Sequence, residues 1–432
     1  MITPRIAAHT LGCKVNQYDT QAMVEIFEGA DYQIAPFESE ADVYLINTCT
    51  VTGTGDRKSM QLIRRVGRER PNASIIVAGC LAQREAARLL ALPGIRLVIG
   101  TQRRGEVYDL FTQAIREGRA ISAVDNFKDA PFERLSVARH EGRTRAVMKI
   151  QEGCDRHCSY CVVPSVRGPV RSLPLPELRT EAERLAQSRF LEIVLTGIHL
   201  TSYGRERGEV LLDAIRAVHS VEGIERIRLG SLEPLIADDA FVDMITQLPK
   251  VCRQFHLALQ SGSDTVLKRM NRRYTRAQFA EAVARVRTAM PDAAVTTDIL
   301  TGFPGETERE AEETFRFVEE MRFSRIHVFP FSKRTGTVAA GLPGQLSAEI
   351  KRERATQLIN LGNKLEREYA KEWIGHEVDV LFEEETERGA EGYTGQYVRV
   401  AADGTPGVIQ RVRIERTAGA LAIGTVNRFG KG

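Results

Sequence analysis

The first 115 residues alternate short apolar runs with longer amphipathic segments. The apolar runs have the length of buried strands. They are Arg5–Thr10, Val43–Thr48 and Ser74–Gly79. Helical periodicity covers residues 17–29, 54–70 and 81–91. Because strands that alternate with helices are typical of parallel sheets, we predict that residues 1–117 form an open parallel α/β sheet.

Six further strand patterns, separated by helical patterns, lie between residues 144 and 373. The strand patterns are Arg145–Gln151, Leu191–Leu195, Arg226–Gly230, Phe255–Leu259, Ala294–Ile299 and Arg325–Phe329. The helical patterns are 176–189, 209–219, 238–247, 275–289 and 307–322, and a longer one over 347–373 closes this part. Six strand–helix units predict a partial (β/α)6 barrel with its chemistry on the loops after the strands. The polar, irregular segment 118–143 is interpreted as a linker.

Residues 374–432 contain short strand-like pieces with Gly and Asp turns between them. The pieces are Gly375–Phe382, Tyr393–Val400, Gly407–Ile414 and the residues from Thr425 onward. They predict a small antiparallel β-barrel. Barrels of this size often bind nucleic acid through aromatic stacking and a few arginines. The alternative is a stabilising β-cap that makes no RNA contact.

The totals describe an ordinary globular protein. A chain of 432 residues is too long for one core and implies two or three domains. No apolar run approaches the roughly 18 residues that span a bilayer, and no signal or lipidation pattern opens the chain. Seven cysteines are an odd number and do not favour a disulfide framework. We expect a cytoplasmic protein without membrane contact, and we expect a monomer.

The net charge of +3 hides local runs of basic residues. The runs are Arg57, Lys58, Arg64, Arg65, Arg68 and Arg70; then Arg167 and Arg171; then Lys268, Arg269, Arg272, Arg273 and Arg276. Such runs are usually solvated faces. Arginine-rich runs near a catalytic loop are also what a phosphate backbone would contact.

One nine-residue stretch, Gly153–Cys161, carries the strongest chemical signal. Its cysteines are Cys154, Cys158 and Cys161. A four-iron cluster takes one thiolate per iron, and no fourth cysteine follows nearby. A cluster held here would keep one iron open for a non-protein ligand, which makes it a site for chemistry. The alternative is a zinc site completed by His157, but the nearest later histidines, His199 and His219, lack partners at the usual spacing.

Three other cysteines each follow a predicted strand of the first sheet. They are Cys13, Cys49 and Cys80. Because the carboxyl ends of parallel strands share one edge, three thiols distant in sequence should converge there. The alternative is three separate core cysteines, since free Cys is often buried. We favour a second metal site, again with three ligands, and we expect the remaining Cys252 to be a small buried residue.

The Cys-x3-Cys-x2-Cys spacing, with the aromatic Tyr160 before the last cysteine, resembles the motif of the radical S-adenosylmethionine (SAM) superfamily. The resemblance implies that the open iron binds the amino and carboxylate groups of SAM, and that reduction cleaves SAM to a 5′-deoxyadenosyl radical. It also implies an electron donor of the flavodoxin or ferredoxin type. Short sequence motifs after the later strands strengthen this resemblance. The implied SAM contacts are Tyr160, Thr196, Gly197, Ser231, Glu233, Gln260 and Asp298.

The sequence motifs around Cys13, Cys49 and Cys80 resemble those of the amino-terminal domain of the methylthiotransferases. They are Leu11-Gly12-Cys13-Lys14-Val15-Asn16, Asn47-Thr48-Cys49-Thr50-Val51 and Ala78-Gly79-Cys80-Leu81-Ala82-Gln83. The resemblance implies a second [4Fe-4S] cluster that serves the sulfur chemistry. The motif around Cys13 looks most like that of the branch that acts on N6-threonylcarbamoyladenosine (t6A) at position 37 of tRNA. The end of the chain resembles the TRAM module of this family.

This resemblance implies a tRNA anticodon stem-loop as partner and a set of RNA contacts. Arg167 and Arg171 would clamp phosphates or the threonylcarbamoyl carboxylate. The other implied contacts are Asn16, Arg273, Tyr393 and Arg399. Two alternatives stay open: a methylthiotransferase acting on isopentenyladenosine or on a ribosomal protein, and an iron–sulfur RNA-binding scaffold without catalysis.

Overall fold

The computed structural model describes residues 3–127, 130–137 and 144–427. The amino-terminal part is a six-stranded parallel sheet with strand order β2-β1-β3-β4-β5-β6. Its strands are β1 (Arg5–Thr10), β2 (Gln33–Ala35), β3 (Val43–Thr48), β4 (Ser74–Gly79), β5 (Ile95–Ile99) and β6 (Ile121–Ala123). Its helices are α1 (Lys14–Glu28), α2 (Gly53–Glu69), α3 (Cys80–Leu90) and α4 (Val107–Glu117). The predicted open parallel sheet is confirmed.

Helix α1 begins at Lys14, three residues before its predicted start. Cys13 is in an extended conformation at the helix N-cap. The side-chain amide of Asn16 donates to the carbonyls of Leu11 at 2.8 Å and Thr48 at 3.0 Å, which fixes the first turn against the end of β3. The apolar periodicity that predicted the helix starts only after this polar turn. The segment predicted as a linker also contains β6, and its residues 128–129 and 138–143 lie outside the described residues.

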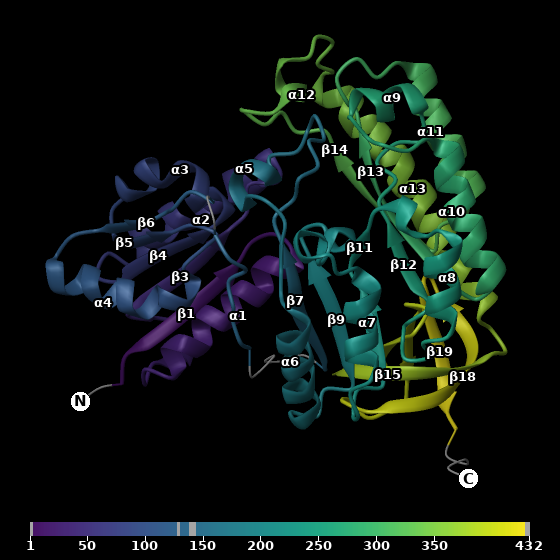
Figure 1. The fold of residues 1–432 in the computed structure, drawn as a ribbon, viewed down its shortest axis with the longest axis horizontal. Coiled ribbons are helices and arrows are strands. Elements are labelled where there is room, and N and C mark those ends of the chain that lie inside the picture. Colours follow the sequence, from purple (N-terminus) through teal and green to yellow (C-terminus); the bar gives the residue numbers. More distant parts are fainter. Residues whose placement is uncertain (1–2, 128–129, 138–143, 428–432) are drawn as a thin grey trace.

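The central part is the predicted partial barrel (Figure 1). Its parallel strands are β7 (Arg145–Glu152), β9 (Glu192–Gly197), β10 (Arg226–Leu229), β12 (Gln254–Leu257), β13 (Ala294–Thr301) and β14 (Arg325–Pro330). The outer helices are α6 (Leu175–Gln187), α7 (Leu211–His219), α8 (Asp239–Thr246), α10 (Arg276–Ala289), α11 (Glu308–Met321) and α13 (Ala348–Glu372). A parallel bridge between Ile227 and Val251 connects the two halves of the strand array.

The carboxyl-terminal part is a closed five-stranded barrel that packs below the central one (Figure 1). Its strands are β15 (Glu377–Thr386), β16 (Gly389–Thr394), β17 (Arg399–Ala402), β18 (Ile409–Ala418) and β19 (Leu421–Val426). Four pairings are antiparallel, whereas β17 and β19 are parallel. The prediction of one strand over Tyr393–Val400 is wrong, because a turn with Tyr397 at φ 64° separates β16 from β17.

Arginines of the central barrel fix this small barrel in place. Arg226 donates to the carbonyl of Asp379 at 2.6 Å, and Arg228 donates to that of Thr394 at 3.1 Å. The small barrel therefore closes the end of the central barrel opposite the strand-end loops. Among the described residues, no helix has the length and apolar composition needed to cross a bilayer.

Candidate active site

The loop that carries Cys154, Cys158 and Cys161 leaves the end of β7 through a turn that only glycine fits. Gly153 has φ 73°, and a Cβ there would lie 1.8 Å from the carbonyl oxygen of Pro169. The amide of Cys154 donates to the carbonyl of Gly168 at 3.0 Å, and the amide of Ser159 donates to that of Met270 at 3.0 Å. Backbone bonds on both sides thus hold the three thiols at the mouth of the barrel.

Burial makes two thiols of this loop, those of Cys154 and Cys161, reluctant to ionise on their own. Burial raises the pKa of Cys154 to about 11 and that of Cys161 to about 12, and the neighbouring Cys158 thiol adds to both shifts. Arg272 lies on the other side, with its Nη1 atom 3.4 Å from the Cys158 sulfur. Thiolates crowded in a buried place require a bound cation, so the donor set fits a metal centre.

Cys13, Cys49 and Cys80 lie at the carboxyl edge of the first sheet, after β1, β3 and β4. A Cβ on Gly12 would lie 3.0 Å from the Cys49 sulfur, so the first two loops touch. Burial raises the pKa of Cys49 to about 12, and the nearby Cys80 and Cys13 thiols raise it further. The structure therefore brings together the three thiols that the strand-end argument grouped.

The spacing of the thiols fits a cluster better than a single zinc ion. A tetrahedral zinc with Zn–S bonds of about 2.3 Å holds its sulfur atoms roughly 3.8 Å apart. Among the described residues, only His256, Asp298 and His327 place three possible metal-ligand atoms all within 4.8 Å of one another. Each cysteine set is therefore more widely spaced in this structure than the ligands of a tetrahedral zinc ion.

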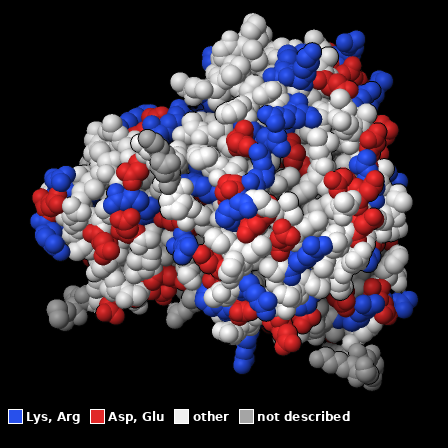
Figure 2. All heavy atoms as spheres, in the orientation of Figure 1, with Lys and Arg blue, Asp and Glu red and all other residues white. Residues whose placement is uncertain are grey.

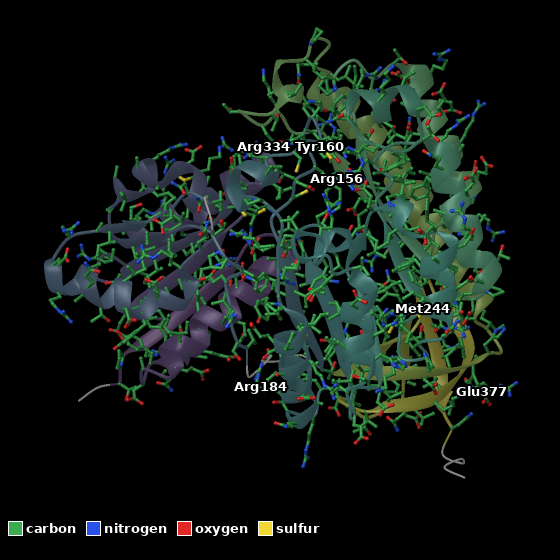
Figure 3. The ribbon with its side chains drawn as sticks, viewed as in Figure 1. Arg156, Tyr160, Arg184, Met244, Arg334 and Glu377 are labelled. Atoms are coloured by element: carbon green, nitrogen blue, oxygen red, sulfur yellow. The ribbon has the colours of Figure 1, made fainter. Side chains whose placement is uncertain are left out.

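The two cysteine sets are neighbours, and Arg167 connects them. Helix α5 (Val163–Arg167) follows Cys161 directly, and its Val166 packs against Cys80. The Arg167 Nε atom donates to the Cys80 sulfur at 3.2 Å. Figure 3 shows Tyr160, Arg156 and Arg334 at this junction of the amino-terminal sheet and the barrel. The two three-cysteine sets therefore meet at the junction between the amino-terminal sheet and the central barrel.

Glu233 organises the strand-end loops next to the Cys154 set. One oxygen lies 2.8 Å from His199 Nε2, and the other accepts from Arg272 at 2.9 Å. Burial alone would raise the pKa of Glu233, but the His199 hydrogen bond and the Arg272 charge lower it to about 2. The carboxylate is therefore a fixed anion beside the thiols. His199 is engaged here, whereas the hypothetical zinc ligand His157 is exposed.

The other residues predicted to contact SAM lie on the strand-end loops around Glu233, with one exception. Thr196 is buried, and Gly197 leaves room for the Gln151 side chain, which accepts from the His199 amide at 2.7 Å. Gln260 adopts φ 68° and its amide donates to the Asp298 carbonyl at 2.8 Å. Ser231 is exposed at the start of β11 (Ser231–Leu232).

The exception is the side chain of Asp298. It lies 3.3 Å from His256 Nε2. Its backbone, rather than its carboxylate, contacts the Gln260 loop. The carboxylate of Asp298 pairs with histidine, and its contact with SAM stays a prediction.

Comparisons with known proteins decide the family. Residues 5–100 match "Uncharacterized protein family UPF0004", and residues 148–318 match "Radical SAM superfamily". The threonylcarbamoyladenosine tRNA methylthiotransferase MtaB of Bacillus subtilis is 42% identical over 94% of this chain and 92% of its own. The chain belongs to the radical SAM methylthiotransferase family.

Other members and a more distant structure agree with this assignment. MtaB of Aquifex aeolicus is 34% identical over 95% of this chain and 99% of its own. A tRNA-2-methylthio-N(6)-dimethylallyladenosine synthase of Methylacidiphilum infernorum is 34% identical over 91% and 87%. The radical SAM methyltransferase TsrM from Kitasatospora setae shares the fold, with a TM-score of 0.56 and 15% identity over 75% of this chain and 72% of its own.

Three residues predicted to contact RNA lie in the interior of this methylthiotransferase. Asn16, Arg167 and Arg171 are 1%, 1% and 6% exposed. Asn16 and Arg167 hydrogen-bond to each other, and Arg171 donates to the Arg167 carbonyl at 2.6 Å. They hold the two cysteine loops together, so the prediction of a phosphate clamp at Arg167 and Arg171 is not supported.

The remaining predicted RNA contacts are accessible to different degrees. Arg273 is exposed after α9 (Asp264–Arg269), where Figure 2 shows Lys and Arg side chains in a run toward the mouth of the barrel. Arg399 is exposed and pairs with Glu391. Tyr393 is half-buried and stacks on Tyr397 at a ring distance of 4.8 Å.

Sequence reasoning missed Arg272, the cation that touches the Cys158 sulfur, Glu233 and the Tyr274 ring. It selected the next residue, Arg273, from the same basic run. Arg272 turns inward because the chain after α9 packs beneath the cysteine loop, where Asn271 donates to the His157 carbonyl at 2.7 Å. No local signal distinguishes two adjacent arginines, so only the fold identifies the inner one.

Lys14 of the amino-terminal part lies within electrostatic reach of residues from the central and the carboxyl-terminal parts of the methylthiotransferase. Burial lowers the pKa of the Lys14 amine, although the residue as a whole retains exposed surface. Tyr397, Arg145, Arg228 and Glu192 lie within electrostatic reach of this amine. The side-chain amine of Lys14 makes no hydrogen bond or ion pair with any residue in the described ranges. An enclosed cation without a partner is suited to an anionic ligand.

Proposed function

We propose that this chain is a tRNA methylthiotransferase that replaces the C2 hydrogen of t6A at position 37 with a methylthio group. The observation that carries the proposal is the pair of three-cysteine sites held side by side by Arg167. The t6A substrate is supported by the 42% identity to the B. subtilis MtaB protein, whereas two other MtaB proteins, at 34% and 35%, are no more similar to this chain than the dimethylallyladenosine synthases, at 34% and 35%.

Two [4Fe-4S] clusters and SAM fit the residues present. Cys154, Cys158 and Cys161 would hold one cluster, and the thiols of Cys13, Cys49 and Cys80 would hold the other. When bound, these groups supply a carbon radical for an unactivated C–H bond and a sulfur atom for its replacement. The fixed anion of Glu233 and the cation of Arg272 would orient the charged amino acid end of SAM.

Arg167 and the buried charges around it keep the two sites in register. Arg167 contacts Glu152 from one side and Cys80 from the other. Asp19 of α1 accepts from Lys149 of β7 at 2.6 Å, so the amino-terminal sheet is bound to the barrel wall by ionic hydrogen bonds. A base placed between the sites would meet both without domain movement.

The Lys14 amine supports t6A over a neutral substrate. The threonylcarbamoyl group carries a carboxylate, whereas an isopentenyl group carries no charge. Lys14 would supply a charged hydrogen-bond donor to this carboxylate from a position next to Cys13. With an isopentenyl group in the site, the Lys14 amine would have no hydrogen-bond acceptor. This missing hydrogen bond would weaken binding of the isopentenyl substrate.

The chain organisation supports an RNA partner and a reduced cytoplasmic setting. Residues 1–117 would carry the sulfur-donating site, 144–373 the radical site, and 374–432 a TRAM module that contacts the anticodon stem-loop. An electron donor of the flavodoxin or ferredoxin type would reduce the radical site. Thiolate-held clusters suit the reducing cytoplasm, and a monomer contains the complete set of site residues.

Nucleoside mass spectrometry tests the function directly. tRNA from a host that lacks this activity is analysed with and without this chain supplied. We expect 2-methylthio-N6-threonylcarbamoyladenosine to appear. The isopentenyl counterpart would keep the reaction and overturn the substrate. The absence of any methylthio nucleoside from a preparation that cleaves SAM would redirect the search to a protein substrate.

Lys14→Met tests the substrate preference. A hydrogen bond to a charged group contributes about 1.5–3 kcal/mol, so kcat/KM for t6A-containing tRNA should fall about 10- to 150-fold. Methylthiolation of tRNA that contains isopentenyladenosine should not fall. Lys364→Met removes an exposed amine on α13 as the matched control. An equal loss on both tRNAs would contradict a carboxylate-reading role for Lys14.

A further inference from the structure

An arginine-lined groove lies on the outer surface of the amino-terminal sheet. It has a volume of about 510 Å³ and runs along α2 beside the end of α3. Its cations are Arg57, Arg64, Arg65, Arg68 and Arg88. Its one carboxylate, Asp56, pairs with Arg334 at 2.5 Å and with Arg84 at 3.5 Å. The α2 groove therefore presents a strong excess of positive charge that the function above does not use.

The helical spacing places the cations on one face of α2. Arg57, Arg64 and Arg68 follow the i, i+7, i+11 pattern with Met60 between them, while Ile63 and Val66 are buried on the other face. Arg64 and Arg68 are four residues apart, and like charges at this spacing destabilise a helix on their own. Arg57 to Arg68 covers about 16 Å at 1.5 Å per residue, which is long enough to follow several phosphates of a nucleic acid strand.

The existing partners of these arginines are weak. Arg65, Arg68 and Arg88 meet Glu38 at 2.9 Å, Glu69 at 3.2 Å and Glu85 at 3.1 Å respectively, in exposed ion pairs. Such pairs contribute little to stability. Arg57 meets only a hydroxyl, that of Thr54 at 3.0 Å, and Arg64 has no ion pair within the described part of the chain. The guanidinium groups are therefore available to phosphate oxygens.

The groove begins at the active site. A Cβ on Gly55 of the first turn of α2 would lie 3.6 Å from the Cys49 sulfur. The Gly53 amide donates to Ser332 at 2.8 Å, and Arg334 donates to Thr50 at 2.6 Å, so the loop after β14 holds this turn against the barrel. A strand whose base enters between the two cysteine sets can continue along α2.

We propose that the α2 groove binds the phosphate backbone of the tRNA next to the target nucleotide. This inference rests on the proposed function and names the surface that holds its substrate. An acidic electron-donor protein is the other polyanion that could occupy it. The groove starts at Cys49 rather than at the Cys154 set that the reductant must serve, and RNA is therefore the favoured occupant.

Salt-dependent tRNA binding tests the groove. The variant Arg57→Ala/Arg64→Ala/Arg68→Ala is compared with wild type between 50 and 200 mM salt. Each lost phosphate contact changes the slope of log K against log salt by about 0.7–0.9, so the slope should become about 2–3 units shallower. Affinity at 50 mM salt should fall about 10- to 100-fold. Arg57→Lys/Arg64→Lys/Arg68→Lys retains the charges and should retain most of the slope.

The matched control removes three other exposed arginines and the same charge. Arg179→Ala/Arg309→Ala/Arg316→Ala lies on α6 and α11 and should change tRNA affinity less than twofold. Melting temperature and iron content verify that each variant is folded. An unchanged slope in the groove variant would overturn the proposal, as would a loss of flavodoxin-dependent reduction with tRNA binding intact. Failure of the proposed function is separate, because it shows as a missing product with wild-type enzyme.

Discussion

Cys13→Ala is expected to abolish methylthiolation of tRNA while SAM cleavage to 5′-deoxyadenosine continues. Cys13 belongs to the set on the first sheet, whereas Cys154, Cys158 and Cys161 form the other set on the barrel. Its side chain makes no capping hydrogen bond to α1 and is exposed, so its removal leaves α1 and the neighbouring strands in place. The change therefore removes a proposed metal ligand with little effect on the fold.

Three measurements separate the two sites in this variant. Nucleoside mass spectrometry should find no methylthio product, chromatography should find 5′-deoxyadenosine, and the iron content should fall by about half. Cys252→Ala is the control, because Cys252 is buried outside both sets and its loss should leave both activities. Loss of SAM cleavage in Cys13→Ala, with the Cys154 set still loaded with iron, would show that the two sites do not divide the chemistry as proposed.

The sequence was sufficient for the cysteine sets because strand topology determines where strand ends meet. Cys49 and Cys80 directly follow β3 and β4, whose neighbours in the sheet are set by the alternating pattern alone. Cys154, Cys158 and Cys161 are close in sequence, so a single loop brings them together. In both cases, the course of the backbone alone brings the cysteines together.

The roles of individual arginines could not be predicted, because they depend on contacts between distant segments. Arg167 follows the cysteine loop and resembles a surface clamp in sequence, yet α1 and α3 cover it and leave it 1% exposed. Arg272 and Arg273 share one basic run but face opposite ways. The same reason explains Tyr397, whose turn is stabilised by Arg228 of the central barrel, 4.9 Å above its ring.

Arg167→Met is expected to destabilise the junction between the amino-terminal sheet and the barrel by about 3–5 kcal/mol, the usual result of breaking a buried ion pair. The Arg167 Nη1 atom lies 3.0 Å from both carboxylate oxygens of Glu152, and Nε lies 3.2 Å from the Cys80 sulfur. Methionine fills much of the same volume but leaves the Glu152 charge short of a cation. The Cys80 thiolate also loses its hydrogen bond, so iron retention by the first-sheet set should fall.

The effect should be constant above the unfolded pKa of Glu152 and should change only at lower pH. Burial alone would raise the pKa of Glu152, but Arg167, Lys149 and Arg104 lower it below the usual range. In the wild type, this carboxylate contributes stability above its unfolded pKa of about 4.3, and the contribution is lost as pH falls toward the folded value. In Arg167→Met, part of that contribution is absent already at neutral pH.

Anaerobic urea denaturation at pH 5 and pH 7.5 measures both effects. The midpoint of Arg167→Met should lie below that of wild type at pH 7.5, and the gap should persist at pH 5, since Glu152 stays ionised in the wild type there. Arg179→Met on α6 removes an arginine from an exposed ion pair and should shift the midpoint by an amount that corresponds to less than about 1 kcal/mol. If Arg167→Met matched this control and retained its iron, Lys149 and Arg104 alone would balance Glu152. The two cysteine sites would then be held in register by packing of α1 and α5 rather than by the buried charge.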